Sequence, residues 1–194
     1  TLILTNRGKL QELAGQYRVI TKAISNSPFI EHEREMYLGY TAEVLNELPE
    51  EVPAQFMPSL FQNLIQKKYE IRSFFLQGKF YSMAIFSQAE QQTQLDFRNY
   101  NYRKSNRTCP YQLPAILEEK LRSLADHFGL NACSFDLVKT PENDHVFLEV
   151  NPGGQFGMVS YPCNYHLEKK LAFELIQHSR NGNTQDSSQT HPEK

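Results

Sequence analysis

A two-residue connection, Gln77-Gly78, joins two aromatic-rich runs of eight residues each, and so short a connection favours their antiparallel pairing. The runs extend from Tyr69 to Leu76 and from Lys79 to Phe86. Aromatic and β-branched residues favour strands, and a short connection containing glycine is typical of a tight turn between antiparallel strands. The sequence therefore predicts a β-hairpin over residues 69–86.

Apolar residues at helical spacing follow farther along the chain. The repeat runs from Leu113 to Phe128, and Gly129 stands where a left-handed helix cap belongs, so we predict a helix over residues 112–128. The other predicted elements are strands at 1–5, 17–24, 37–45, 131–139 and 145–151, helices at 9–16 and 164–177, the latter capped by Asn164, and a Pro-rich connection at 49–58. Residues 180–194 hold no large apolar side chain, and we expect a disordered tail there.

The composition is that of a folded chain without an overall cationic field. The 194 residues are 40% apolar and 22% charged, with a net charge of −2, so neither nucleic acid nor an anionic membrane is an expected partner. The longest apolar runs fall far below the roughly 20 residues that a membrane span needs. Three cysteines match neither a disulfide framework nor a zinc site, which favours a reducing cytoplasm. The chain opens on strand-like residues without an initiator methionine, and we interpret it as a piece of a longer protein.

Three oxygen-bearing side chains come together if the strands at 131–139 and 145–151 pair across the turn that separates them. With Thr140 opposite His145, Asp136 lies opposite Glu149, and Asn151 falls on the same face as Glu149. Two facing carboxylates repel unless a cation sits between them, and carboxylate and amide oxygens suit Mg²⁺. The alternative is a hairpin whose outer face is simply solvated.

The same residues resemble the Asp…Glu-x-Asn pattern with which ATP-grasp ligases hold magnesium. The segments that carry the resemblance are 134–137 and 147–152. Four upstream features stand in the order that the family expects: Lys22, the hinge-like segment 61–65, the strand segment 69–72 and the Asp-Phe-Arg stretch 96–98. The resemblance implies an α+β fold of two lobes with mainly antiparallel sheets and the nucleotide between them. It also implies ATP and Mg²⁺ as cofactors. It further implies nucleotide contacts from Lys22, Gln62, Asn63, Leu64, Ile65 and Glu70, metal ligands Asp136, Glu149 and Asn151, and catalytic roles for Arg72 and Arg98.

A narrower likeness covers the run from Asn151 to Ser160 and the segment 161–169 that follows it. These residues are similar to the maturases of graspetides, in particular the grasp-with-spasm subfamily. Those enzymes use ATP to join Asp or Glu side chains of a ribosomal precursor peptide to Ser, Thr or Lys side chains. The resemblance implies such a peptide as partner, an N-terminal lobe with hinge at 1–65 and a C-terminal lobe at 66–179. A homodimer is the candidate assembly.

The chain departs from the family pattern at three places. Ser25-Asn26-Ser27-Pro28 replaces a glycine-rich phosphate loop, Ser134 replaces an arginine found in some relatives, and an N-terminal domain of the family has no counterpart in this sequence. Three functions therefore stay open: the peptide ligase, a ligase that adds a free amino acid, and a peptide-binding module without turnover. Two local alternatives also stay open, namely an ion pair between Glu70 and Arg72, and an RNA-binding role for the cationic stretch 98–107.

Overall fold

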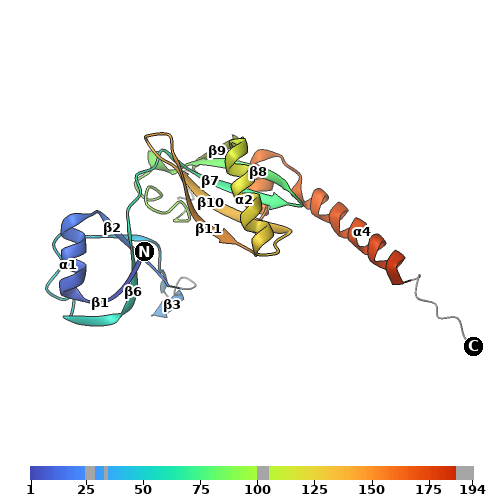
Figure 1. The fold of residues 1–194 in the computed structure, drawn as a ribbon. Coiled ribbons are helices and arrows are strands. Elements are labelled where there is room, and N and C mark those ends of the chain that lie inside the picture. The colour runs from blue at the N-terminus through green and yellow to red at the C-terminus, as the bar shows by residue number, and fades with distance from the viewer. Residues whose placement is uncertain (25–28, 33–34, 100–104, 187–194) are drawn as a thin grey trace, which may run out of the picture. The chain divides into compact units, whose positions relative to one another are not determined.

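The computed structural model describes residues 1–24, 29–32, 35–99 and 105–186 (Figure 1). They form two compact units. Unit 1 comprises residues 1–69, 86–107 and 139–144, and unit 2 comprises residues 70–85, 108–138 and 145–194. Two later segments of the chain, 86–107 and 139–144, thus return to unit 1.

Unit 1 is built on an antiparallel four-stranded sheet with the order β1-β6-β2-β5. Its strands are β1 (Leu2–Asn6), β2 (Val19–Lys22), β5 (Ala42–Val44) and β6 (Gln55–Asn63), while β3 (Phe29–His32) and β4 (Glu35–Leu38) pair separately. Helix α1 (Arg7–Gln16) begins after Asn6, whose side chain accepts a hydrogen bond from the Lys9 backbone N–H at 3.1 Å. The buried side chains of Leu10, Val19 and Phe61 form the core of this sheet and helix.

Two sequence predictions for unit 1 are wrong. The strand expected at 37–45 is two strands, β4 and β5, separated by residues 39–41. The connection expected at 49–58 already includes β6 from Gln55 onward. The β1–β6 pairing is irregular there, since Leu4 faces Ser59 whereas Asn6 faces Gln55. Pro58 lies within this irregular stretch, which is where a sheet tolerates a residue without an N–H donor.

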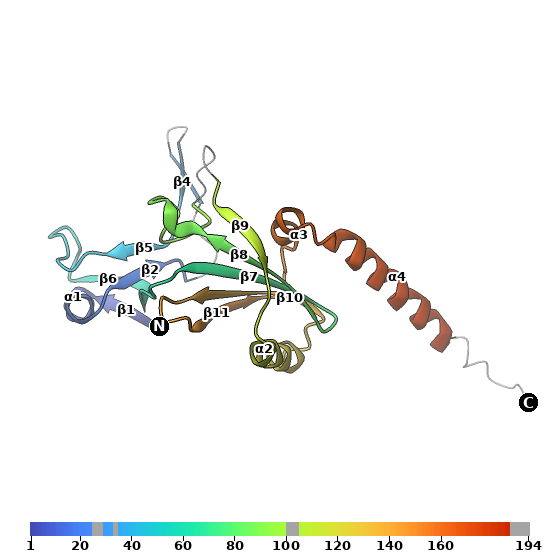
Figure 2. The ribbon, with the colours of Figure 1, turned by 90° about the horizontal axis from the view of Figure 1, so that it is seen from above.

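Unit 2 contains a five-stranded sheet with the order β11-β10-β7-β8-β9 (Figure 2). Its strands are β7 (Tyr69–Leu76), β8 (Lys79–Phe86), β9 (Arg107–Tyr111), β10 (Ala132–Lys139) and β11 (His145–Asn151), and a short 3-10 helix, Ser87–Ala89, follows β8. The predicted hairpin is confirmed, with Leu76 opposite Lys79 at its turn. Gln77 and Gly78 have φ values of 46° and 82°, the positive pair that a two-residue hairpin turn requires.

One face of this sheet is covered by helix α2 (Ala115–His127), which confirms the predicted helix. The rings of Phe75 and Phe80 have centroids 5.0 Å apart and both pack against Phe135. The Arg122 guanidinium of α2 lies over the Phe80 ring at 5.5 Å. Since successive side chains of a strand point to opposite faces, Phe74 belongs to the other face.

The segment after β11 covers that other face. Phe74 packs against Phe156 with centroids 5.8 Å apart, and Tyr81 packs against Tyr165 at 5.6 Å. The helices here are α3 (Gly157–Cys163) and α4 (Leu167–Asp186). Arg72 lies two residues before Phe74 on β7. Its side chain therefore points to the same face of the sheet as Phe74, the face that the segment after β11 covers.

The helix predicted at 164–177 is misplaced at both ends. Asn164 ends α3 in the left-handed conformation, with φ 54°, and does not cap α4. Asparagine is favoured both before a helix and at a left-handed helix end, so the sequence signal is ambiguous. Helix α4 runs on to Asp186, so residues 180–186 of the expected disordered tail are helical, and 187–194 lie outside the described residues. Among the described helices, none has the length and apolar character needed to cross a membrane.

Candidate active site

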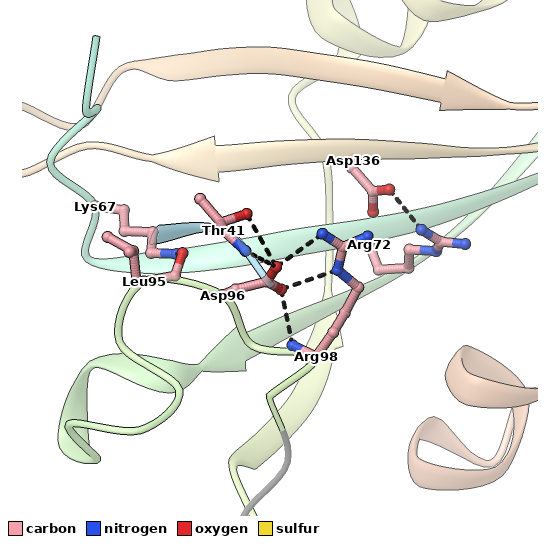
Figure 3. Close-up of polar contacts among 7 residues, drawn as sticks. All are labelled: Thr41, Lys67, Arg72, Leu95, Asp96, Arg98 and Asp136. Carbon is pink, nitrogen blue, oxygen red and sulfur yellow. Dashed lines mark hydrogen bonds and ion pairs between the residues drawn. The ribbon is translucent and has the colours of Figure 1, made fainter. Parts of the chain in front are cut away.

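A buried ion pair joins the two neighbouring strands β7 and β10 of unit 2. Nη1 of Arg72 donates to Oδ2 of Asp136 at 2.5 Å (Figure 3). The two side chains are only 6% and 15% exposed. Glu70, considered from the sequence as the partner of Arg72, lies two residues earlier on the same strand and is itself buried. The structure thus gives Arg72 a partner from a strand 64 positions away in sequence.

Two further donors of Arg72 lack a partner among the described residues. Its Nε and Nη2 atoms are both buried and make no hydrogen bond. Leaving a buried donor unpaired costs about 1–3 kcal/mol, so such atoms in a native protein call for a partner. The flat guanidinium fork matches the oxygens of a carboxylate or a phosphate. The geometry around Arg72 therefore suits an anionic ligand.

The turn between β10 and β11 has a different register from the one predicted. The Thr140 N–H donates to the carbonyl of Asp144 at 2.9 Å, so Thr140 pairs with Asp144 and not with His145. Asn143 in this turn has φ 70°, the left-handed position of a three-residue hairpin loop. At the turn itself, therefore, the pairing lies one residue away from the predicted one.

The end of β11 forms a tight turn that orients Asn151. Oδ1 of Asn151 accepts from the Gly153 N–H at 2.9 Å, and its backbone carbonyl accepts from the Gly154 N–H at 3.2 Å. Glu149 is exposed on β11, which is an edge strand of the sheet. The side-chain oxygen of Asn151 is therefore held in one orientation by the backbone that follows it.

The chemistry of these side chains fits a magnesium ion. Asp136 has a second carboxylate oxygen besides the one bound to Arg72, and Asn151 Oδ1 has a second lone pair. Together with the carboxylate of Glu149 they are hard oxygen donors, as Mg²⁺ prefers. Among the described residues no three His, Cys, Asp or Glu side chains form a metal-holding group. A magnesium ion at these residues would therefore complete its shell with phosphate oxygens and water.

Arg98, the second arginine singled out from the sequence, lies in unit 1 and binds Asp96. Its Nε and Nη2 donate to the two carboxylate oxygens of Asp96 at 2.9 and 2.8 Å, and the Thr41 hydroxyl donates to the same carboxylate at 3.0 Å (Figure 3). Burial by itself raises the pKa of Asp96, but the hydrogen bonds and charge of Arg98, together with a hydrogen bond from the Thr41 side chain, lower it from 3.8 to about 2. Arg103 and Lys104 of the cationic stretch lie outside the described residues.

The depressed pKa of Asp96 predicts a loss of stability in acid. The folded-state pKa of about 2 lies below the unfolded value of 3.8, so the stabilisation is complete above about pH 4 and is lost as the pH falls through 2. We expect Asp96→Asn to be less stable than wild type at neutral pH, with the difference shrinking toward pH 2. Urea unfolding at several pH values measures this, with the exposed Asp126→Asn as control. A constant difference at every pH would contradict the assignment.

The residues proposed to hold the nucleotide also lie in unit 1, apart from Glu70. Lys22 is the last residue of β2 and faces Leu60 of β6. Gln62 lies on β6 and donates from Nε2 to the Thr1 hydroxyl at 2.6 Å. Asn63 ends β6, and Leu64 and Ile65 follow it; the Leu64 N–H donates to the Arg18 carbonyl at 2.8 Å. Segment 62–65 thus covers the end of β6 and the two residues after it, while Lys22 lies on the neighbouring strand β2.

Sequence reasoning missed the two contacts that best define the site. The Arg72–Asp136 pair depends on β10 lying beside β7, which no local pattern reveals. The second is a buried hydrogen bond from the Ser134 hydroxyl to the Gly154 carbonyl. The family resemblance singled out Ser134, but the sequence did not reveal the Gly154 carbonyl as its partner.

Solved structures are similar to this chain, whereas no protein-family model and no curated protein matches it. Macrocyclase MdnC from Microcystis aeruginosa MRC, solved with precursor peptide MdnA, is 27% identical with a TM-score of 0.74, over 91% of this chain and 53% of MdnC. A RiPP-associated ATP-grasp ligase from Chryseobacterium gregarium, solved with ADP and a leader and core peptide, is 23% identical with a TM-score of 0.73. The match covers 80% of this chain and 47% of that ligase.

A third similar structure is the ATP-grasp ligase PsnB with a phosphomimetic precursor variant, Mg and ADP, at 14% identity and a TM-score of 0.66. The chain therefore has the ATP-grasp fold, and the expected α+β architecture with antiparallel sheets is confirmed. Within that fold it resembles the RiPP-associated ligases and macrocyclases, as the run from Asn151 implied. It spans about half the length of these proteins.

Proposed function

We propose that the protein is an ATP-dependent peptide ligase of the ATP-grasp type that cross-links a ribosomal precursor peptide. It activates Asp or Glu side chains as acyl phosphates and joins them to Ser, Thr or Lys side chains. The observation that carries the proposal is the buried Arg72, paired with Asp136 and left with two unpaired donors. The likeness to structures solved with ADP, Mg and precursor peptides supports it.

In the first step, a carboxylate oxygen of the peptide attacks the γ-phosphorus of ATP, and the bond from that phosphorus to ADP breaks. In the second, a hydroxyl or amine of the peptide attacks the acyl carbon, phosphate leaves and the nucleophile loses its proton. Both steps gather negative charge on phosphoryl oxygens. Positioning and charge neutralisation are therefore the main tasks of the protein.

The residues divide these tasks. The unpaired Nε and Nη2 donors of Arg72 hold the carboxylate or the phosphoryl group that is transferred, and the Asp136 carboxylate keeps the guanidinium in place. Bound Mg²⁺ supplies charge neutralisation of the phosphates. We assign its ligands to Asp136, Glu149 and Asn151, nucleotide contacts to Lys22, Glu70 and segment 62–65, and a second phosphate contact to Arg98.

The cellular compartment and the oligomeric state are parts of the same proposal. Cys109, Cys133 and Cys163 are free thiols, which suits the reducing cytoplasm. The proposed assembly is a homodimer, supported by the exposed apolar side chains of Phe173 and Ile176 on α4, which are 58% and 51% exposed. Light scattering coupled to size-exclusion chromatography measures the assembly directly.

Mass spectrometry tests the function. The protein is incubated with Mg²⁺, ATP and a synthetic peptide rich in Asp, Glu, Ser, Thr and Lys, and we expect product masses lower by whole multiples of one water, with matching phosphate release. A mass gain by one amino acid, when free amino acids are supplied, would replace the proposal with the amino-acid ligase. Peptide binding without phosphate release would instead identify a binding module.

A further inference from the structure

A serine on β10 connects the strand of Asp136 to the turn that carries Asn151. Ser134 is fully buried, and its hydroxyl donates to the Gly154 carbonyl. Ser134 and Asp136 are two residues apart and so point to the same face, about 7 Å apart along the strand. The serine therefore attaches the turn beside Asp136.

The turn from Asn151 to Gln155 is closed mainly by its own backbone. Besides the two bonds made by Asn151, the Gln155 N–H donates to the Gly153 carbonyl at 2.9 Å. These bonds orient the Asn151 amide within the turn, but they do not determine how close the turn stands to β10. That spacing depends on contacts from the turn to the sheet.

Close packing of Gly154 supplies the second such contact. Gly154 is buried with φ 73°, and a Cβ at this position would lie 3.0 Å from a ring carbon of Phe74. Because Gly154 has no side chain, its backbone can pack directly against the Phe74 ring, and its carbonyl lies within hydrogen-bond distance of the Ser134 hydroxyl. A larger residue would push the turn away from the sheet.

We propose that Ser134 is a positioning residue that sets the place of the Asn151 amide oxygen relative to the Asp136 carboxylate. The inference rests on the proposed function, because it concerns the same magnesium-binding residues. Partners that orient a metal ligand typically matter by 10–100-fold in metal affinity. The buried Ser134 thus has a positioning task in this chain.

The test compares Ser134→Ala with Ser73→Ala in the full chain. Ser73 is also fully buried and shares a hydrogen bond with the Ser82 hydroxyl at 2.7 Å, but it points to the opposite face of the same sheet. Both variants lose one buried hydroxyl, so we expect similar falls in melting temperature. Calorimetric titration of Mg²⁺ into protein saturated with ADP then measures metal affinity.

We expect Ser134→Ala to bind Mg²⁺ about 10–100-fold more weakly than wild type and Ser73→Ala to bind it as wild type does. Unchanged affinity in Ser134→Ala, or an equal loss in both variants, would overturn the inference while leaving the proposed function standing. Absence of Mg²⁺-dependent binding in the wild type would overturn the proposed function itself, and the inference with it.

A second pair of variants displaces the turn without touching Ser134. Gly154→Ala and Gly78→Ala both place alanine at a positive φ, 73° and 82°, but only the former meets another residue, since a Cβ at Gly78 has nothing within 4 Å. We expect weakened Mg²⁺ binding in Gly154→Ala alone. Wild-type affinity in Gly154→Ala would contradict the role assigned to the spacing of the turn.

Discussion

Replacing Arg72 with lysine is expected to lower cross-linking by about two to three orders of magnitude, the effect of removing one preorganised donor at a developing oxyanion. Lysine keeps the positive charge but presents a point charge on a flexible stem in place of a planar fork. It cannot pair with Asp136 and also offer two parallel donors to an anion. The loss should therefore appear in the chemical step and not only in peptide affinity.

Single-turnover cross-linking, followed by mass spectrometry, separates that step from peptide binding. Arg122→Lys is the matched control, since Arg122 belongs to the same unit but lies on the opposite face, where it donates to the Gly78 carbonyl at 3.1 Å. It should retain near wild-type activity. Comparable rates in Arg72→Lys and wild type would remove Arg72 from the reaction and the proposed function would lose its main support.

Asp136→Asn is expected to destabilise the protein by about 3–5 kcal/mol, because removing one partner of a buried ion pair leaves the other charge uncompensated. The remaining charge is that of Arg72, which is 6% exposed. The asparagine side chain has nearly the same shape, so the loss reports on charge and not on packing. Urea denaturation at neutral pH measures the free energy of unfolding.

Glu142→Gln is the matched control for this experiment. Glu142 is exposed in the turn between β10 and β11, and a surface substitution of this kind changes stability by about 0.5 kcal/mol or less. The paired register predicted from the sequence leads to another result, in which Asp136→Asn equals or exceeds wild type because two repelling carboxylates no longer face each other. An Asp136→Asn variant as stable as wild type would support that register and contradict the buried pair.

Local patterns were enough to predict much of the fold. The hairpin at 69–86 follows from its aromatic runs and from Gln77-Gly78, whose positive φ values the turn demands. Helix α2 follows from a 3.6-residue apolar repeat that ends at Gly129, which has φ 63°. In both cases the determining interactions join residues that are near in sequence, so a local sequence pattern is enough to predict them.

Ambiguous local signals account for the errors. Asn143 adopts a left-handed conformation and shifts the turn by one residue, which the same Pro-Glu-Asn-Asp sequence does not reveal in advance. Asn164 likewise ends one helix where it was expected to begin another. In both cases asparagine suits more than one conformation, so its position alone does not decide between them.

The sequence by itself determined the hairpin at 69–86, the strands that carry Asp136 and Glu149, and helix α2. It also marked Asp136, Glu149 and Asn151 as residue types suited to magnesium. Only the tertiary structure decided that Arg72 pairs with Asp136, that its remaining donors are buried, and that Ser134 holds the turn of Asn151. The reason is that strand order in a sheet, and the burial that follows from it, are set by contacts between residues distant in sequence, which no local period records.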